Sequence, residues 1–306
     1  MAKPSQKCSD RAHGPCDPSF HMRASIVPDP TVAIAHGTDP LAMVREALDL
    51  IDAAQIVAPT DRVVLKPNYV EPMMPDTGVT TDPRVIEGVI AWLQDLGAAD
   101  ITVAESTWQR SRTQRAFEMV GLPEMAERRG VKLLNLWDDE HVDVTIPNAL
   151  SLKKVLLPRT VLEADCLISL PKLKCHSMAY VTLGIKNLMG AVFPEKDLMH
   201  RDLDERLRDL ATVLRAKLTV IDGLIGAERH ENAGNPIETN VIIAGADPVA
   251  TDAVGAQVMQ IDPTRVGHLR LCAEAGLGEH RPDHITLLGE PVERVSKPYR
   301  QPSGFR

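Results

Sequence analysis

The stretch PKLKCH, residues 171–176, places two lysines, a cysteine and a histidine directly after the apolar run CLISL. Lysine is seldom placed against a buried strand unless its charge is used. Histidine changes its protonation state near neutral pH and can serve as a general acid or base. These residue types indicate a site for a negatively charged molecule. Lys174 and His176 are its candidate catalytic groups, and Lys172 is a candidate ligand-binding group.

A further lysine lies inside the apolar segment YVTLGIKNLMGAV, residues 180–192, which we interpret as a helix. Glycines on either side of it, Gly184 and Gly190, would let a ligand approach the backbone closely. An ammonium enclosed in this way must pair with an anion or lose its proton, unless its stem reaches solvent. We therefore take Lys186 as a candidate catalytic residue and Asn187 as a candidate ligand-binding residue.

The elements that must position these groups alternate along the chain. Short apolar, β-branched runs predict strands, and apolar residues spaced three and four apart predict helices. The predicted strands are 31–36, 62–68, 100–105, 131–136, 165–170, 217–223, 240–245 and 284–289, and the predicted helices are 40–54, 84–97, 113–121, 203–215, 247–260 and 265–276. Strands separated by helices imply crossover connections, so the predicted fold class is α/β, with a largely parallel sheet and helices on both faces.

Polar residues follow most of these strands. Ligands bind beyond the carboxyl ends of the strands in open parallel sheets, so we expect the polar groups to meet at one edge. Glu105 is then a candidate catalytic group, and Lys66, Asn68 and Asp222 are candidates for binding the ligand. Asp247 also follows a strand, but it is more simply read as the N-cap of the next helix.

A second expected contribution comes from the start of the helix at 84–97. Thr80 and Thr81 precede it, and backbone N–H groups at a helix start can hold a phosphate or a carboxylate. We take both threonines as candidate ligand-binding residues. The fingerprints GxxxxGK[ST], GxGxxG and GxSxG are absent, so neither a P-loop, a Rossmann dinucleotide site nor a hydrolase nucleophile elbow is indicated.

The composition excludes several classes of protein. A net charge of −8 and an aromatic content of 3% argue against a general nucleic-acid binder. No apolar run approaches the roughly 20 residues that cross a bilayer, so we expect no membrane segment. The five cysteines are scattered without a CxxC pair, which argues against a disulfide framework or a self-contained zinc or iron–sulfur site. We expect a protein of the reducing cytoplasm.

The 306 residues divide unequally. Residues 1–30 are polar and rich in proline and serine, and we interpret them as a flexible leader without a secretory apolar segment. Residues 31–290 form a single α/β domain in this interpretation, and 291–306 form a tail. The alternation within 142–158 predicts a β-hairpin insertion at an edge, which could pair across a two-fold axis in a homodimer.

Taken in order, these motifs resemble the domain of unknown function 362 family. The matching segments are LKPN (65–68), GVTTDP (78–83), VAES (103–106), LISLPKLKCH (167–176), GIKNLMG (184–190), VIDG (220–223) and DPVATDAVG (247–255). Cys175 stands where the family pattern PKLKTH has threonine, and its thiol could be a metal ligand, a nucleophile or a small substitute for threonine.

The resemblance implies an α/β fold and leaves the activity unassigned. Some relatives carry a fused ferredoxin-like module with four-iron clusters, which implies redox chemistry. This chain lacks those cysteines, so a ferredoxin-like partner would have to supply such a cluster. The family is also distantly similar to the nickel-pincer lactate racemases, which use lysine and histidine in an α/β cleft. We transfer no cofactor on that similarity.

Three hypotheses follow from the sequence. In the first, the chain is an enzyme that binds a small anionic substrate through four lysines, Lys66, Lys172, Lys174 and Lys186. His176 is the general acid or base, and Glu105 or Asp222 orients a lysine or the histidine. In the second, the chain is a metal or redox protein that binds iron, zinc or nickel through Glu105, His176 and Asp222 with His200 or Cys175. In the third, it is a non-catalytic anion-binding or assembly protein. The sequence identifies neither substrate nor cofactor.

Overall fold

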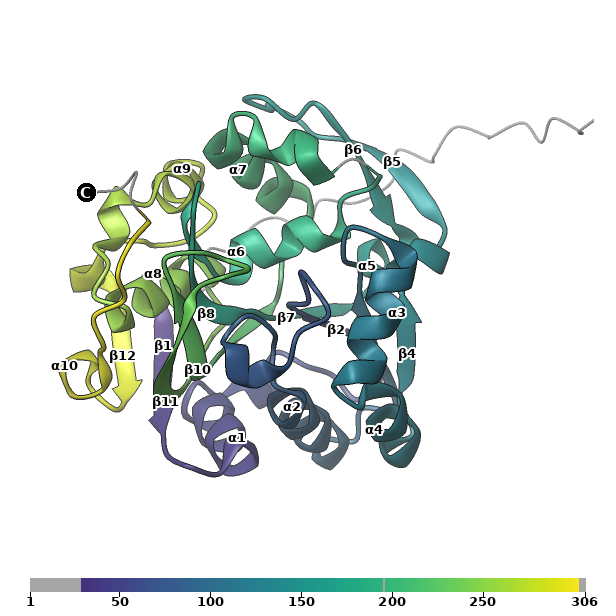
Figure 1. The fold of residues 1–306 in the computed structure, drawn as a ribbon, viewed down its shortest axis with the longest axis horizontal. Helices are drawn as coiled ribbons and strands as arrows, with labels where there is room; N and C mark the ends of the chain where they lie inside the picture. The colour runs from purple at the N-terminus through teal and green to yellow at the C-terminus, as the bar shows by residue number, and fades with distance from the viewer. Residues whose placement is uncertain (1–28, 195, 303–306) are drawn as a thin grey trace, which may run out of the picture.

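The computed structural model describes residues 29–194 and 196–302, so most of the predicted leader lies outside the described residues. Its strands are β1 Thr31–His36, β2 Arg62–Pro67, β3 Asp100–Glu105, β4 Lys132–Asn135, β5 His141–Thr145, β6 Lys154–Pro158, β7 Cys166–Leu170, β8 Lys172–His176, β9 Tyr180–Thr182, β10 Leu218–Glu228, β11 Asn235–Gly245 and β12 Thr286–Gly289. Ten of these described strands form one sheet through the middle of the molecule, in the order β12-β1-β11-β10-β7-β2-β3-β4, with β8 pairing with β10 and β9 (Figure 1).

The sheet is largely parallel, as predicted, because β4, β3, β2, β7 and β10 run in one direction. Strand β11 runs the other way, since it is antiparallel to both of its neighbours, β1 and β10, and the short strand β9 is antiparallel to β8. The carboxyl end of β11 therefore lies at the opposite edge of the sheet. Asp247, which follows β11, caps helix α8 (Pro248–Val258) by accepting hydrogen bonds from Val249 N at 2.8 Å and Ala250 N at 3.0 Å. The expectation of a single edge was thus wrong for this strand.

Helices cover both faces of the sheet, which confirms the predicted α/β class (Figure 1). Helices α1 (Pro40–Leu50), α2 (Pro83–Asp95), α3 (Arg110–Met119) and α4 (Leu122–Arg129) share a core with one face, and α6 (Gly184–Asn187), α7 (Leu203–Val213), α8 and α9 (Gly267–Glu274) share a core with the other. Because side chains alternate along a strand, Val32 and Ile34 of β1 lie in one core, and Ala33 and Ala35 lie in the other. No helix in the described ranges combines the length and apolar character that a membrane span needs.

The predicted hairpin insertion is present as β5 and β6, which pair antiparallel in a separate two-stranded sheet. Ile146, Val155 and Leu157 bury their side chains in the core on the α7 side of the main sheet. The hairpin is followed by the short helix α5, Arg159–Leu162, which leads into β7. The insertion is therefore packed onto the domain through alternate residues of its strands.

The segment predicted as a tail packs against the sheet instead. It contains the short helix α10, Val292–Val295, and a buried tyrosine, Tyr299, whose hydroxyl lies 2.8 Å from Thr239 Oγ1. The backbone N–H of Arg300 donates to Glu228 Oε2 at 2.8 Å, at the end of β10. A Cβ on Gly226 would lie 2.2 Å from the Tyr299 hydroxyl, so this position has no room for a side chain. The segment up to residue 302 thus belongs to the domain.

Candidate functional site

PKLKCH forms strand β8 rather than a loop beyond a strand. Its residues are buried, and β8 pairs in parallel with β10 and antiparallel with β9. Because side chains alternate along a strand, Leu173 and Cys175 enter the apolar core, while Lys172, Lys174 and His176 share the other side. Polar side chains can occupy this buried strand because each of the three meets a partner on another segment.

A cavity of about 80 Å³ lies at the carboxyl ends of β2 and β3 and beside β8. Predicted site residues in its wall are Lys66, Asn68, Glu105, His176, Lys186 and Asn187. Other residues of the wall include Trp108, Lys196, His200 and Glu231. Since a single water needs roughly 10–15 Å³, a cavity of about 80 Å³ has room for a small molecule. The structure therefore brings six of the predicted residues to one small cavity.

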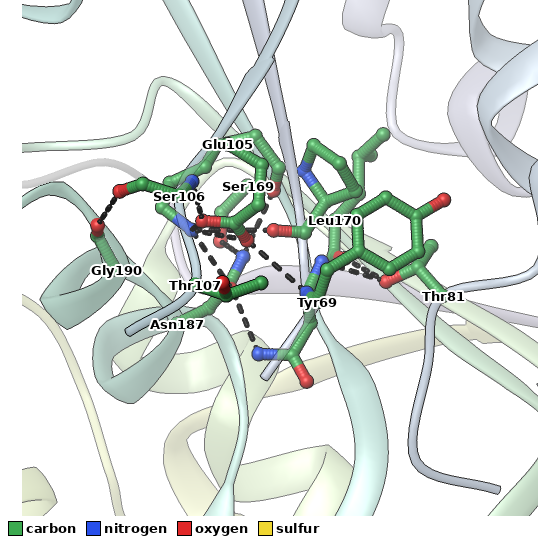
Figure 2. A network of polar contacts seen from close by, with 12 residues as sticks. Tyr69, Thr81, Glu105, Ser106, Thr107, Ser169, Leu170, Asn187 and Gly190 are labelled. Carbon is green, nitrogen blue, oxygen red and sulfur yellow. Dashed lines mark hydrogen bonds and ion pairs between the residues drawn. The ribbon is translucent and has the colours of Figure 1, made fainter. Parts of the chain in front are cut away.

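The base of the cavity is an ion pair between Lys66 and Glu105, both of which are almost fully buried. Lys66 Nζ donates to Glu105 Oε1 at 2.9 Å and to Oε2 at 2.8 Å. The same carboxylate accepts the backbone N–H of Ser106 at 2.7 Å and that of Tyr69 at 3.2 Å, as Figure 2 shows. Burial lowers the pKa of Lys66, and the charge of Glu105 opposes this shift. The attraction between the two groups and their hydrogen bonds offset part of the cost of burying them.

Asparagine side chains connect this pair to the neighbouring strands. Asn187 Nδ2 donates to Lys66 O at 2.9 Å and to Ser169 Oγ at 3.1 Å, which fixes the orientation of the amide. Asn187 Oδ1 then accepts from Asn68 Nδ2 at 3.0 Å. The hydroxyl of Thr81 accepts from Asn68 N at 2.8 Å and donates to Leu170 O at 2.8 Å. Thr81 therefore holds the backbone of Asn68 in place, but it does not line the cavity.

The Lys186 ammonium differs from the other lysines at the site. Its side chain is buried, and its one described hydrogen-bond partner is the sulfur of Met189 at 3.4 Å. No carboxylate oxygen in the described part of the chain lies within ion-pair distance of it. Burial lowers the pKa of Lys186 to about 8, although the charge of Glu231 acts in the opposite direction. Among residues 29–194 and 196–302, Lys186 is thus a buried cation without a close counter-ion.

His176 is held in one tautomer. Its Nδ1 accepts the backbone N–H of Met178 at 3.0 Å and that of Ala179 at 3.2 Å, so Nδ1 carries no proton. The Nε2 atom lies 3.9 Å from Glu231 Oε1. Burial, aided by the charge of Lys186, lowers the pKa of His176 far below neutrality. In this geometry His176 is a neutral donor through Nε2–H, and Lys186 rather than His176 has a pKa near neutrality.

Lys196 and His200 reach the cavity from a short 3-10 helix, Lys196–His200. Lys196 Nζ donates to Ser106 O at 2.6 Å, Ser106 Oγ at 2.8 Å and Gly190 O at 2.7 Å. Burial lowers the pKa of Lys196 to about 7. The His200 ring stacks on His176 with centroids 6.0 Å apart. The sequence analysis missed Lys196 because the segment around it has no apolar periodicity, and it named His200 only as a metal ligand.

Four other predicted site residues are engaged elsewhere. Lys172 Nζ donates to Asp222 Oδ2 at 2.7 Å, and both side chains are fully buried away from the cavity wall. The same oxygen accepts Asp82 N at 2.7 Å, so a carboxylate of the protein already occupies the start of α2, where a ligand anion was expected. Lys174 Nζ donates to Val79 O at 2.8 Å, and burial lowers the pKa of Lys174 to about 7. Thr80 is also fully buried and does not line the cavity.

Of the five residues in the metal hypothesis, Glu105, His176 and His200 line the cavity, but Asp222 and Cys175 do not. Asp222 is paired with Lys172, and the Cys175 thiol lies 3.8 Å from Arg300 O, outside the cavity wall. Burial raises the pKa of Cys175 to about 11, so the thiol stays protonated and is a poor nucleophile at neutral pH. Within residues 29–194 and 196–302, no group of three His, Cys, Asp or Glu side chains is arranged to hold a metal ion.

Gly190 is required by the closeness of the Lys66–Glu105 pair. A Cβ at this position would lie 2.5 Å from Lys66 Nζ and 2.7 Å from Glu105 Oε1. We expect Gly190→Ala to displace these buried groups and to lower the free energy of unfolding by about 1–3 kcal/mol, measured by urea denaturation. Gly37→Ala is the steric control, because a Cβ there would meet only the Met43 side chain, at 3.5 Å, and Gly37 is not among the positive-φ glycines. An equal loss in both variants would contradict this account of Gly190.

Comparisons with known proteins agree with the motifs at this site. A model of the family described as "Domain of unknown function (DUF362)" matches residues 63–257. A thylakoid-associated protein of Synechocystis sp. is 26% identical over 277 residues, which cover 86% of this chain and 83% of the relative. The lactate racemase apoprotein from Thermoanaerobacterium thermosaccharolyticum is similar at a TM-score of 0.38 and 12% identity, over 81% of this chain but only 58% of the racemase. Because the family match extends over more than half of its length, the chain belongs to the domain of unknown function 362 family.

Proposed function

We propose that the cavity binds a small anionic molecule, a carboxylate or a phosphate, and that the chain is an enzyme that acts on it. The observation that carries the proposal is the Lys186 ammonium, which is buried at the cavity wall and has, among the described residues, a thioether as its one hydrogen-bond partner. A buried charge without a partner costs stability. Such a group is expected where its charge is used on a ligand.

The charge and the size of the cavity support the same ligand class. The described residues of its wall include three lysines and two glutamates, so with all five ionised these side chains carry a net charge of 3 − 2 = +1. Lys174 adds a further positive group close by, since its charge acts on His176. A net positive, mostly buried cavity favours an anion. The volume of about 80 Å³ has room for a small anion.

Lys186 is the proposed acid–base group. Its pKa of about 8 lies near neutral pH, where a group can both donate and accept a proton efficiently. The Nε2–H of His176 is proposed to donate a hydrogen bond to the ligand, since Nδ1 is occupied by two backbone amides. A bound anion would favour the protonated form of Lys186 and raise its pKa.

Ligand stabilisation of the intact chain tests the proposal. We expect acetate, propionate or inorganic phosphate to raise the melting temperature above that in chloride at equal ionic strength. A ligand at 100 times its Kd stabilises by about 2.7 kcal/mol. If no small carboxylate and no phosphate exceeds chloride, the cavity is not an anion site and the proposal is wrong.

We also propose a reducing compartment such as the cytoplasm. The described cysteines Cys166, Cys175 and Cys272 are free and buried, and free thiols are typical of reducing compartments. The relative from Synechocystis sp. is named as thylakoid-associated. Fractionation of cells, followed by a salt wash of the membranes, would separate a freely dissolved protein from one that is attached at a membrane surface.

A further inference from the structure

Asp252, on helix α8, is a buried carboxylate with an unusual set of partners. Its Oδ1 accepts the backbone N–H of Gly184 at 2.6 Å, and its Oδ2 accepts that of Ile185 at 2.9 Å. These amides begin helix α6, where backbone N–H groups have no acceptor within their own helix. No lysine, arginine or histidine of the described ranges forms an ion pair with Asp252. Both oxygens of the Asp252 carboxylate therefore bind the first turn of α6.

Helix α6 cannot define its own position. It spans only Gly184–Asn187, and a helix of one turn is unstable without tertiary contacts. Asn187 fixes its far end through hydrogen bonds to Lys66 O and Ser169 Oγ. Asp252 fixes its near end. Between these two anchors lies Lys186, whose direction into the cavity depends on both.

The contact at the near end is close. A Cβ on Gly184 would lie 2.9 Å from Asp252 Oδ1 and 2.7 Å from Thr219 Cγ2, so only glycine lets the carboxylate reach the amides. Burial raises the pKa of Asp252 to about 7, which means that the folded protein holds the ionised form at a cost. If apolar packing alone positioned α6, the protein would not need to hold a buried, ionised carboxylate.

We propose that Asp252 is a positioning residue of the anion site, holding the start of α6 so that the Lys186 ammonium points into the cavity. This inference rests on the proposed function, since it concerns the same lysine. Asp252 acts through the backbone rather than as a counter-ion, because the carboxylate whose charge acts on Lys186 is that of Glu231.

The test compares Asp252→Asn with Asp247→Asn in the full chain. Asp247 is a matched control: it is the N-cap residue of the same helix, is fully buried, and accepts the backbone N–H groups of Val249, Ala250 and Glu279, none of which belongs to α6. Both variants are expected to lose stability. Only Asp252→Asn is expected to weaken the binding of acetate or inorganic phosphate, by about tenfold or more, because a small displacement of a binding group has a large effect. Equal dissociation constants in the two variants would overturn the proposal.

Two further measurements separate positioning from general support. In a Lys186→Met background, Asp252→Asn should not change anion affinity further, since both changes remove the same contact. In the wild type, hydrogen exchange of the Gly184 and Ile185 amides should slow when acetate or phosphate binds. That measurement needs no variant, and unchanged exchange in the bound state would overturn the proposal even if Asp252→Asn fails to fold. A wild type that binds neither anion would instead overturn the proposed function.

Discussion

Replacing Lys186 with methionine is expected to raise the stability of the protein at pH 7 and to abolish its stabilisation by anions. Methionine keeps an unbranched, flexible side chain and removes the buried charge. The effective penalty for burying an ion is several kcal/mol, so removing one that has no close counter-ion is expected to be stabilising. Urea denaturation with and without acetate or phosphate measures both effects. A substitution that stabilises the fold and removes binding identifies a residue kept for function.

The pH dependence gives an independent check on Lys186. Folding lowers its pKa from 10.5 to about 8. Between these values the unfolded chain holds a proton that the folded chain has released, so stability increases as the pH rises through this window. The destabilisation is thus complete below about pH 8 and lost above pH 10.5. Lys186→Met should remove this part of the slope.

The control is Lys153→Met, which changes an exposed lysine of the hairpin. It should leave the anion response and the pH slope as in the wild type. A Lys186→Met protein that is less stable at pH 7, and still responds to acetate or phosphate as the wild type does, would show that Lys186 serves the fold and not a ligand.

Some elements could be predicted to the residue because local sequence decides them. Strands β1 and β3 begin and end as expected, since each apolar run is bounded by polar residues. Strand β8 could not be recognised, because its lysines are tolerated only through partners such as Asp222 and Val79 O, far away in the chain. The sequence predicts a strand at β11, but an apolar run does not indicate whether the strand is parallel or antiparallel to its neighbours. Its reversal against β10 depends on the connection between them.

The candidate site likewise has features that the sequence predicts and features that it does not. Lys66 and Glu105 follow adjacent parallel strands, so topology alone brings them to one edge. The protonation state of His176 depends on the turn after it, where Met178 and Ala179 donate to Nδ1. The residue types alone do not predict that turn. Glu231 reaches the cavity from the loop between β10 and β11, and loops have no periodic pattern that predicts which side chain points inward.

The Glu105→Gln variant is expected to destabilise the protein by about 3–5 kcal/mol, because it leaves the Lys66 ammonium buried without a counter-ion. Glutamine keeps the size of the side chain but accepts through only one oxygen, so its amide group would face Lys66 Nζ or the backbone N–H groups of Tyr69 and Ser106. Urea denaturation measures the loss. The matched control is Glu163→Gln, because Glu163 forms a pair of 2.8 Å with Arg159 on the surface.

Removing the surface pair should change the free energy of unfolding by less than about 1 kcal/mol, since exposed ion pairs contribute little. The double variant Lys66→Met/Glu105→Gln separates charge from packing. If the loss in Glu105→Gln comes from the stranded ammonium, removing that ammonium should recover part of it, with a coupling free energy of about 1–3 kcal/mol. Additive losses, or equal losses at Glu105 and Glu163, would mean that Glu105 acts through its backbone hydrogen bonds, and that the charge at the base of the cavity is not what holds β2 and β3 together there.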